Sequence, residues 1–344
     1  MRYIGSKRLL LDNIEKVIKD NIKGKINIFC DIFSWTWTVA EFFKKDYTII
    51  SNDLLFFSHV MQRASIMENV IPEFNKLSEY LWTNPIEYLN NKKVSLNDIT
   101  DTPFIYENYS PNEKSDRMYI SNDNALKIDF IRQSLDEWKQ KELIENNEFF
   151  YLLATLIHAI PFYSNIAWTY WAYLKHWDNR ALKPLELNNI ELLNNSRDNI
   201  SYNEDANNLI KQISGDILYI DPPYNTRQYL PNYHLLETIA KYDSPDIYGK
   251  TWMRPYKNVR SKYCIKKDVL KEFEDLINNA NFKHIILSYS TEWIMNEVDI
   301  QSIMEKYWKE WTFKLYRIPY RRYKHVAWDV KHSLEELLFY IEKK

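Results

Sequence analysis

The sequence predicts an α/β fold in which a largely helical segment interrupts a doubly wound sheet formed by both ends of the chain. Residues 26–33 and 47–51 are short apolar runs near the amino end, and residues 217–221 form a third late in the chain. Between them the strand signal fades, and residues 128–145 have helical spacing. Further strand-like runs follow at residues 284–289, 313–318 and 334–341.

The first two runs predict a nucleotide-binding unit, because a strand, a loop, a helix and a second strand follow one another. Asp53 comes directly after the second strand, where a carboxylate can accept from two ribose hydroxyls. The alternative for Asp53 is the N-cap of the helix that follows. We therefore expect one domain from residues 1–55 and 204–344, with residues 56–203 as a helical insertion.

The run at residues 217–221 ends in Asp-Pro-Pro-Tyr, residues 221–224. Two prolines stiffen the turn, and the Pro222 carbonyl is free to accept a hydrogen bond. Two acceptors beside an aromatic ring suit a planar base with a free amine, such as an adenine rotated out of its stack. The alternative is an ordinary strand end followed by a proline turn.

The net charge of this 344-residue chain is −2, which by itself does not indicate a nucleic-acid partner. The basic residues are clustered, however: residues 250–267 contain seven and no acid, and residues 317–332 contain five against Asp329. Such runs are commonly solvated faces, but after a candidate base-binding loop they favour a phosphate-contacting surface.

No apolar run is long enough to span a bilayer, and the first residues lack the apolar core of a signal peptide. The two cysteines, Cys30 and Cys264, form neither a disulfide framework nor a metal-ligand spacing. We therefore expect a cytoplasmic protein without a structural metal.

Residues 221–229, Asp-Pro-Pro-Tyr-Asn-Thr-Arg-Gln-Tyr, and residues 232–238, Asn-Tyr-His-Leu-Leu-Glu-Thr, resemble the Dam-like class of adenine-specific DNA methyltransferases. The opening Arg-Tyr-Ile-Gly-Ser-Lys at residues 2–7 resembles the same family. The resemblance covers nearly the whole chain and implies a Rossmann-like methyltransferase sheet that uses S-adenosylmethionine. Asp rather than Ser at position 221 is similar to the adenine-modifying variant of the motif.

The resemblance also implies the site. We expect catalysis by Asp221, Pro222 and Tyr224: the first two would accept the amine hydrogens and the tyrosine would stack on the base. The expected cofactor-binding residues are Tyr3, Lys7, Phe33, Asp53, Asp205 and Asp221, with Lys7 on the methionine carboxylate. The expected DNA-binding residues are Arg227, Arg254, Lys257, Arg260, Lys262, Arg321 and Arg322.

The implied reaction is N6-adenine methylation of double-stranded DNA, as in restriction-modification, with a cognate restriction endonuclease as a further partner. We expect a monomer without membrane contact, whose helical insertion reads the target sequence. The alternatives are an RNA or N4-cytosine methyltransferase, and a catalytically silent DNA-binding protein of the same fold.

Several family glycines are tryptophan here. The chain has 4 Gly and 12 Trp, and the family loop Phe-x-Gly-x-Gly reads Phe-Ser-Trp-Thr-Trp at residues 33–37. An indole there is expected to crowd the space beside Asp53, where the methionine would lie. Two explanations are open: UGA codons that mean glycine decoded as tryptophan, or genuine tryptophans in a cofactor-free protein. The other positions of this kind are Trp168, Trp171, Trp252, Trp293 and Trp328, whereas Trp82, Trp138, Trp177, Trp308 and Trp311 look ordinary.

Overall fold

The computed structural model describes residues 5–290, 294–320 and 334–344. These form two compact units. We call the first the sheet unit, which comprises Tyr3–Leu54, Asn195–Gln228 and Val259–Lys344. The second, the helical unit, comprises Leu55–Asn194 and Tyr229–Asn258.

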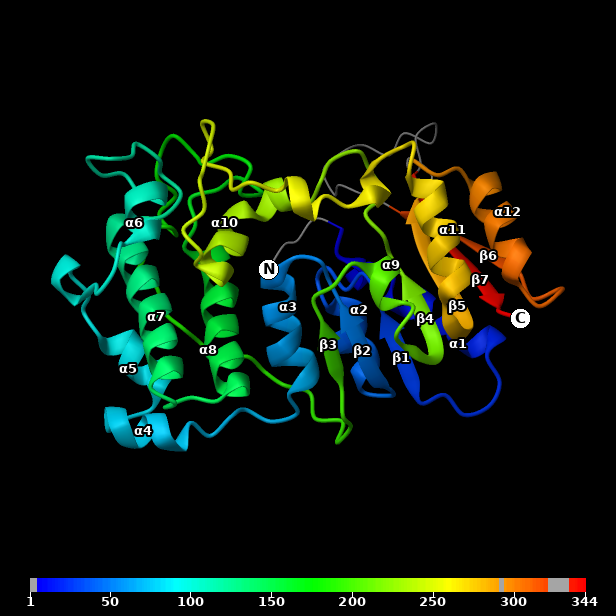
Figure 1. The fold of residues 1–344 in the computed structure, drawn as a ribbon, viewed down its shortest axis with the longest axis horizontal. Helices are drawn as coiled ribbons and strands as arrows, with labels where there is room; N and C mark the ends of the chain where they lie inside the picture. Colours follow the sequence, from blue (N-terminus) through cyan, green and yellow to red (C-terminus); the bar gives the residue numbers. More distant parts are fainter. Residues whose placement is uncertain (1–4, 291–293, 321–333) are drawn as a thin grey trace. The chain divides into compact units, whose positions relative to one another are not determined.

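In the described part of the sheet unit, seven strands form one sheet in the order β3-β2-β1-β4-β5-β7-β6 (Figure 1). All run in one direction except β7, which is antiparallel to both of its neighbours. Phe29 in β1 is paired with Ile217 in β4, which confirms that the two ends of the chain share a sheet. The strands are β1 (Ile28–Asp31), β2 (Thr48–Asn52), β3 (Ile200–Tyr202), β4 (Ser214–Ile220), β5 (Asn281–Ser290), β6 (Lys314–Tyr320) and β7 (Leu334–Glu342).

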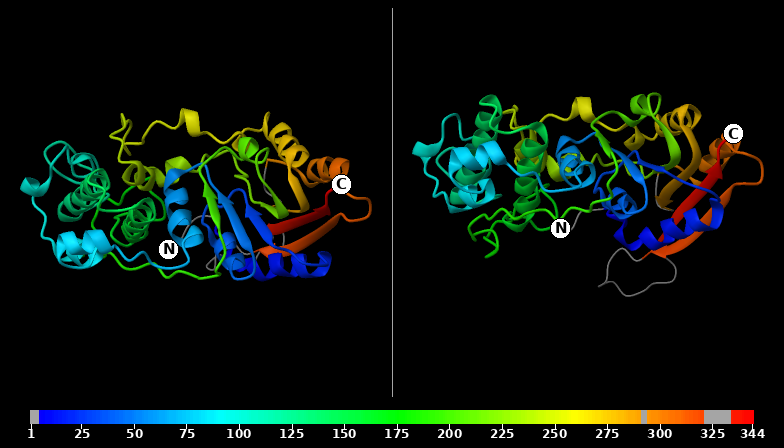
Figure 2. Two further views of the ribbon diagram at one scale, coloured as in Figure 1. Left: turned by 60° about the horizontal axis from the view of Figure 1, so that its bottom comes forward. Right: turned by 90° about the horizontal axis from the view of Figure 1, so that it is seen from below.

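Side chains and helices pack on both faces of the sheet. Successive side chains of a strand point to opposite faces, so neighbouring residues of one strand join different cores. Phe29 stacks on Phe43 with ring centroids 4.6 Å apart, whereas the adjacent Cys30 joins a core with Phe273 on the other face. Figure 2 shows α1 and α11 on opposite sides of the sheet. The helices of this unit are η1 (Lys7–Leu9), α1 (Leu11–Asn21), α2 (Thr38–Lys44), α9 (Ala206–Leu209), η6 (Lys262–Cys264), α11 (Val269–Asn279) and α12 (Glu297–Tyr307).

The helical unit is built around α7 and α8, which pack on each other, and α3, which packs on α8 and α10. Buried carboxylates accept from the first N–H groups of two of its shorter helices. In α6, Asp129 accepts from the backbone N–H groups of Ile105 and Tyr106 at 2.9 and 2.8 Å. In α3, Glu237 accepts from those of Phe56 and Phe57. The helices are α3 (Phe56–Gln62), η2 (Arg63–Met67), α4 (Asn75–Leu81), α5 (Pro85–Asn91), η3 (Leu96–Asp98), α6 (Phe104–Tyr109), α7 (Asn122–Gln140), α8 (Asn146–Ala159), η4 (Ile160–Phe162), α10 (Leu230–Lys241) and η5 (Lys257–Val259).

The break between Leu54 and Leu55 lies beside the sequence-based boundary at residue 55, whereas the boundary at 204 does not coincide with a break between the units. Residues 195–203, which contain β3, belong to the sheet unit. Residues 229–258, expected in the catalytic domain, pack with the helical unit. No helix in the described ranges is long and apolar enough to cross a bilayer.

Four tryptophans have a left-handed backbone, among nine such non-glycine residues in the described ranges. This conformation costs about 1–2 kcal/mol for a residue with a Cβ and is typical of glycine. Trp82 and Trp311, which look ordinary in the sequence, also have this backbone. Their side chains are 93% and 87% exposed, so burial of the indole does not offset the cost. The φ angles are 47° for Trp37, 57° for Trp82, 48° for Trp252 and 71° for Trp311.

The remaining tryptophans expected at glycine positions differ in how far the structure describes them. Trp168 and Trp171 are 71% and 55% exposed, between the paired residues Ile166 and Tyr173. Trp293 and Trp328 lie outside the described residues.

Candidate active site

The carboxyl ends of β1, β2 and β3 meet at one edge of the sheet, because these strands are parallel. Asn52 ties the three ends together: its side-chain N–H groups donate to the carbonyls of Ile32 and Glu204, both at 3.1 Å. The backbone carbonyl of Asn52 accepts from the Ser34 N–H at 2.8 Å, which fixes the loop after β1. Sequence reasoning did not select Asn52, although it stands directly before Asp53.

Two of the predicted cofactor residues lie at this edge. Phe33 packs edge-to-face against Tyr263, with centroids 5.0 Å apart. Asp53 is 8% exposed, and its carbonyl accepts from the Asn203 side chain at 2.7 Å. Asp53 is not the N-cap of α3, a position held by Leu55. The position of Asp53 is therefore compatible with a ribose contact, which stays a prediction.

Asp205 also follows one of these strands, but its carboxylate is used as a helix cap. It accepts from the backbone N–H groups of Asn207 and Asn208 at 3.1 and 3.2 Å and so starts α9. The side chain is exposed. The expected contact with the cofactor's adenine would have to coexist with this cap.

Asp221 follows the carboxyl end of β4 and lies in a cluster of buried charges. Lys7 Nζ is 3.3 Å from Asp221 Oδ1 and 3.1 Å from Oε2 of Glu336, a residue of β7. The same ammonium lies 5.3 Å from the ring centroid of Tyr224. Lys7, expected on the methionine carboxylate, is therefore held at Asp221, and Glu336 was not predicted from the sequence.

Burial perturbs the charged groups at this edge. Burial raises the pKa of Asp221 to about 7, although the Lys7 ammonium opposes the shift. Burial also raises the pKa of Asp31, at the end of β1, to about 8, and the charges of Asp221 and Asp53 add to it. Burial alone would lower the pKa of Lys7, but Asp221 and Glu336 raise it well above its usual value.

These acids suit a cationic ligand. Asp31 Oδ1 is buried and lacks a well-aligned donor among the described residues, although hydrogen bonds from Ser34 and from the Ala40 backbone lower the pKa of this carboxyl. Such an atom costs about 1–3 kcal/mol unless something donates to it. S-adenosylmethionine carries a sulfonium and an ammonium beside its carboxylate, and these cations would lower the pKa values of Asp31 and Asp221 and so favour their ionised forms. The edge formed by Asp31, Asp53 and Asp221 is compatible with that cofactor.

The second half of the matched motif, residues 232–238, lies within α10 of the helical unit and is largely buried. His234 Nε2 is 2.8 Å from the Tyr170 carbonyl, and burial lowers the pKa of this histidine to about 4. Glu237 accepts from the backbone N–H groups of Phe56 and Phe57. These contacts give His234 and Glu237 structural roles within their own unit.

The predicted DNA-binding residues differ in exposure. Arg254 is 6% exposed, and its guanidinium contacts both carboxylate oxygens of Asp243 at 3.1 and 2.7 Å, which favours a structural role. Lys262 is exposed but paired with Glu272 at 3.0 Å. The remaining described members, Arg227, Lys257 and Arg260, are exposed, whereas Arg321 and Arg322 lie outside the described residues. Tyr3, predicted to bind the cofactor, also lies outside them.

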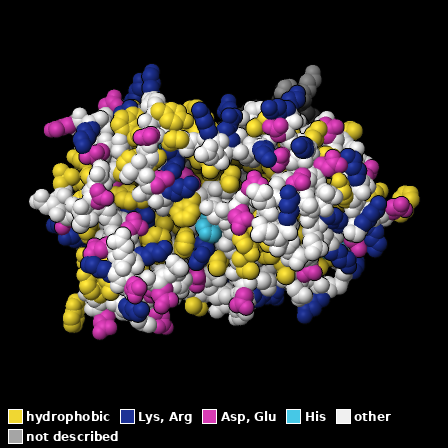
Figure 3. Space-filling model, viewed as in Figure 1, with side chains coloured by type: hydrophobic (Ala, Val, Ile, Leu, Met, Phe, Trp, Pro, Cys, Tyr) yellow, Lys and Arg dark blue, Asp and Glu magenta, His cyan; other side chains and the backbone are white. Residues whose placement is uncertain are grey.

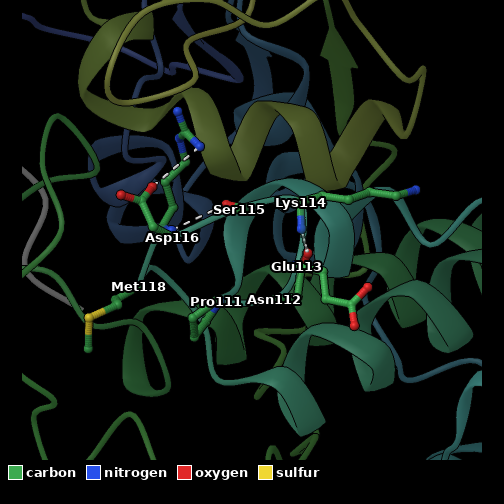
Figure 4. A pocket seen from close by; sticks show the side chains of 8 residues that line it. Pro111, Asn112, Glu113, Lys114, Ser115, Asp116 and Met118 are labelled. Carbon is green, nitrogen blue, oxygen red and sulfur yellow. Dashed lines mark hydrogen bonds and ion pairs between the residues drawn. The ribbon is translucent and has the colours of Figure 1, made fainter.

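Basic side chains are interspersed with acidic ones on the face shown in Figure 3. A separate pocket in the helical unit is lined by residues 111–118, in the loop between α6 and α7 (Figure 4). Within it Arg117 pairs with Asp116 at 3.6 Å. None of the predicted catalytic or cofactor residues belongs to this lining.

The model of the D12 class N6 adenine-specific DNA methyltransferase family matches residues 3–303. The chain belongs to this family. The match confirms the resemblance drawn from the motifs, and the mostly parallel seven-stranded sheet of the described residues agrees with a methyltransferase fold.

The chain is also similar to curated modification enzymes. It is 50% identical over 343 residues to the Type II methyltransferase M.FokI of Planomicrobium okeanokoites, covering 100% of this chain and 53% of that protein. It is 44% identical to Modification methylase StsI of Streptococcus sanguinis, with 100% and 52% covered. The chain thus spans about half the length of these relatives. Identity is 39% to the Type II methyltransferase M.NlaIII of Neisseria lactamica, with 94% and 92% covered.

Proposed function

We propose that this D12 family member transfers a methyl group from S-adenosylmethionine to the exocyclic amine of an adenine in double-stranded DNA. The observation that carries the proposal is the Asp-Pro-Pro-Tyr loop at the end of β4. It places the partly buried Asp221 directly after β4, the strand beside β1, at the same acidic edge as Asp31 of β1 and Asp53 after β2. The family match and the similarity to Type II modification enzymes support the same reaction.

In this proposal S-adenosylmethionine supplies an electrophilic methyl group. Phe33 and the acidic edge would hold that cofactor. Asp221 and the Pro222 carbonyl accept the two hydrogens of the amine, which orients its lone pair and raises its electron density. Tyr224 offers its ring to the extruded base. Because the reaction needs Asp221 as an acceptor, transfer should increase as the pH rises through about 7.

The helical unit is proposed to read the target sequence, and the exposed cations Arg227, Lys257 and Arg260 to hold phosphates. We propose a monomeric, cytoplasmic enzyme of a restriction-modification system, with a cognate endonuclease as partner. The catalytically silent DNA-binding protein is retained as a second candidate, because Trp35 and Trp37 are both half-buried in the loop after β1.

The test is methyl transfer from labelled cofactor to unmethylated genomic DNA, followed by analysis of the nucleosides. The chain and its Trp35→Gly, Trp37→Gly double variant are assayed in parallel, with RNA as an alternative substrate. We expect label in N6-methyladenine, at least with the double variant. Label in N4-methylcytosine or in RNA would replace the proposed substrate. DNA binding by the chain without binding of S-adenosylmethionine and without transfer would establish the silent protein.

A further inference from the structure

Lys7 contacts two carboxylates, those of Asp221 and Glu336, and the two contacts differ in length and geometry. Its ammonium donates a hydrogen bond to Glu336 Oε2 at 3.1 Å. Its contact with Asp221 Oδ1 is longer, at 3.3 Å, and is less well aligned than a full hydrogen bond, although it still lowers the pKa of Asp221. The side chains of Lys7, Asp221 and Glu336 are 5%, 13% and 8% exposed, so water competes little for these contacts.

The fold brings these residues together from distant parts of the chain. Lys7 begins η1, Asp221 follows β4, and Glu336 lies in β7, opposite Ser290 of β5. Successive side chains of a strand point to opposite faces. The preceding residue, Glu335, accordingly accepts from exposed Arg317 at 3.1 Å and belongs to a different ion pair.

We propose that Glu336 is a positioning residue for methyl transfer: it takes the shorter hydrogen bond of Lys7 and so leaves the Asp221 carboxylate able to accept from the amine of the base. The proposal rests on the role proposed above for Asp221. An acceptor already occupied by a buried ammonium would bind the amine less well, because a charge-assisted hydrogen bond is about twice as strong as a neutral one. Glu336 therefore leaves Lys7 near Asp221, where the ammonium lowers the pKa of Asp221, but takes the shorter hydrogen bond of that ammonium.

The charges around Asp221 set the sign of the expected pH effects. The Lys7 ammonium lowers the pKa of Asp221, and the Glu336 carboxylate raises it. Removing the negative charge of Glu336 should therefore move the acidic limb of the rate to lower pH, and removing Lys7 should move it to higher pH. The ionisable groups coupled to Asp221 are Lys7 of η1, Glu336 of β7, Asp31 of β1 and Tyr219 of β4.

The experiment measures kcat against pH for the parent, Glu336→Gln, Lys7→Gln and the control Glu335→Gln, in the Trp35→Gly, Trp37→Gly background. For Glu336→Gln we expect a plateau roughly ten- to a hundredfold lower, with cofactor and DNA affinities unchanged. At pH 6 this variant should keep a roughly fivefold larger fraction of its own plateau than the parent, as for a shift of about one unit from 7. Glu335→Gln should match the parent in both respects.

A double-mutant cycle separates positioning from simple loss of stability. If Glu336 acts through Lys7, then Glu336→Gln should lower the plateau little further when Lys7→Gln is already present. Additive losses, or an acidic limb that stays in place in Glu336→Gln, would overturn the proposal. If Asp221→Asn itself retained near-normal transfer, the role of Asp221 would be the part that is wrong.

Discussion

Trp82 shows at the scale of one residue how a side chain and its backbone can disagree. It ends α4 with a φ of 57° and a ψ of 20°, the left-handed conformation in which helices commonly end at a glycine. Its indole is 93% exposed, so the strained backbone is not offset by burial. Trp311 and Trp37 have the same backbone feature. This pattern supports the explanation in which glycine codons are decoded as tryptophan.

We predict that Trp82→Gly raises the free energy of unfolding by about 0.5–1 kcal/mol, because relief of the left-handed strain exceeds the added flexibility of the unfolded chain. The matched control is Trp138→Gly in the same unit. Trp138 is 4% exposed within α7, and its loss should cost about 3–5 kcal/mol. Denaturant unfolding of both variants measures the difference. A destabilised Trp82→Gly would remove the argument from backbone strain, and tryptophan at this position in peptides from the natural host would remove the decoding explanation.

At the scale of an element, α10 shows how a motif residue can serve the fold. Glu237 is fully buried and accepts from the N–H groups of Phe56 and Phe57 at 3.2 and 2.9 Å, so it caps α3 from a distant part of the sequence. Its carboxylate also pairs with Lys241, one turn further along α10, at 2.9 Å. The N-terminus of α3 therefore depends on α10.

We predict that Glu237→Ala destabilises the protein by about 2–3 kcal/mol, because two buried N–H groups lose their acceptor. Glu137→Ala is the control, since Glu137 pairs with Lys141 at the same helical spacing but is exposed. Its loss should cost about 0.5 kcal/mol or less. Thermal or denaturant unfolding distinguishes the two, and equal effects would show that the cap is not important for stability.

At the scale of the whole molecule, local patterns predicted much of the sheet but fewer of the contacts between distant segments. Apolar runs located β1, β2 and β4, and the sequence predicted that the first run lies near the last, as the pairing of Phe29 with Ile217 shows. Periodicity does not encode the antiparallel insertion of β7 between β5 and β6. The contact of Lys7 with Glu336, 329 positions apart, depends on that insertion and so was not predicted.

The same limit applies to charges and boundaries. A basic run in the sequence does not show which of its members fold inward, and the burial of Arg254 against Asp243 became visible only with the partner in place. Residues 229–258 follow the catalytic motif in sequence but pack with the helical unit, because α10 packs on α3 and α8. Asp53 and Asp221, by contrast, could be placed at strand ends from the sequence, because each stands directly beyond a strand, whereas Phe33 was selected through the family resemblance.

The most direct test of the central claim is the effect of Asp221→Asn on label in N6-methyladenine, measured in the Trp35→Gly, Trp37→Gly background. Asparagine keeps the size of the side chain but replaces a charged acceptor by a neutral amide. We predict that label in N6-methyladenine falls to background, while binding of DNA and of S-adenosylmethionine stays near that of the parent. Near-normal methylation of adenine by this variant would contradict the account, because the acceptor at the end of β4 would then not be needed.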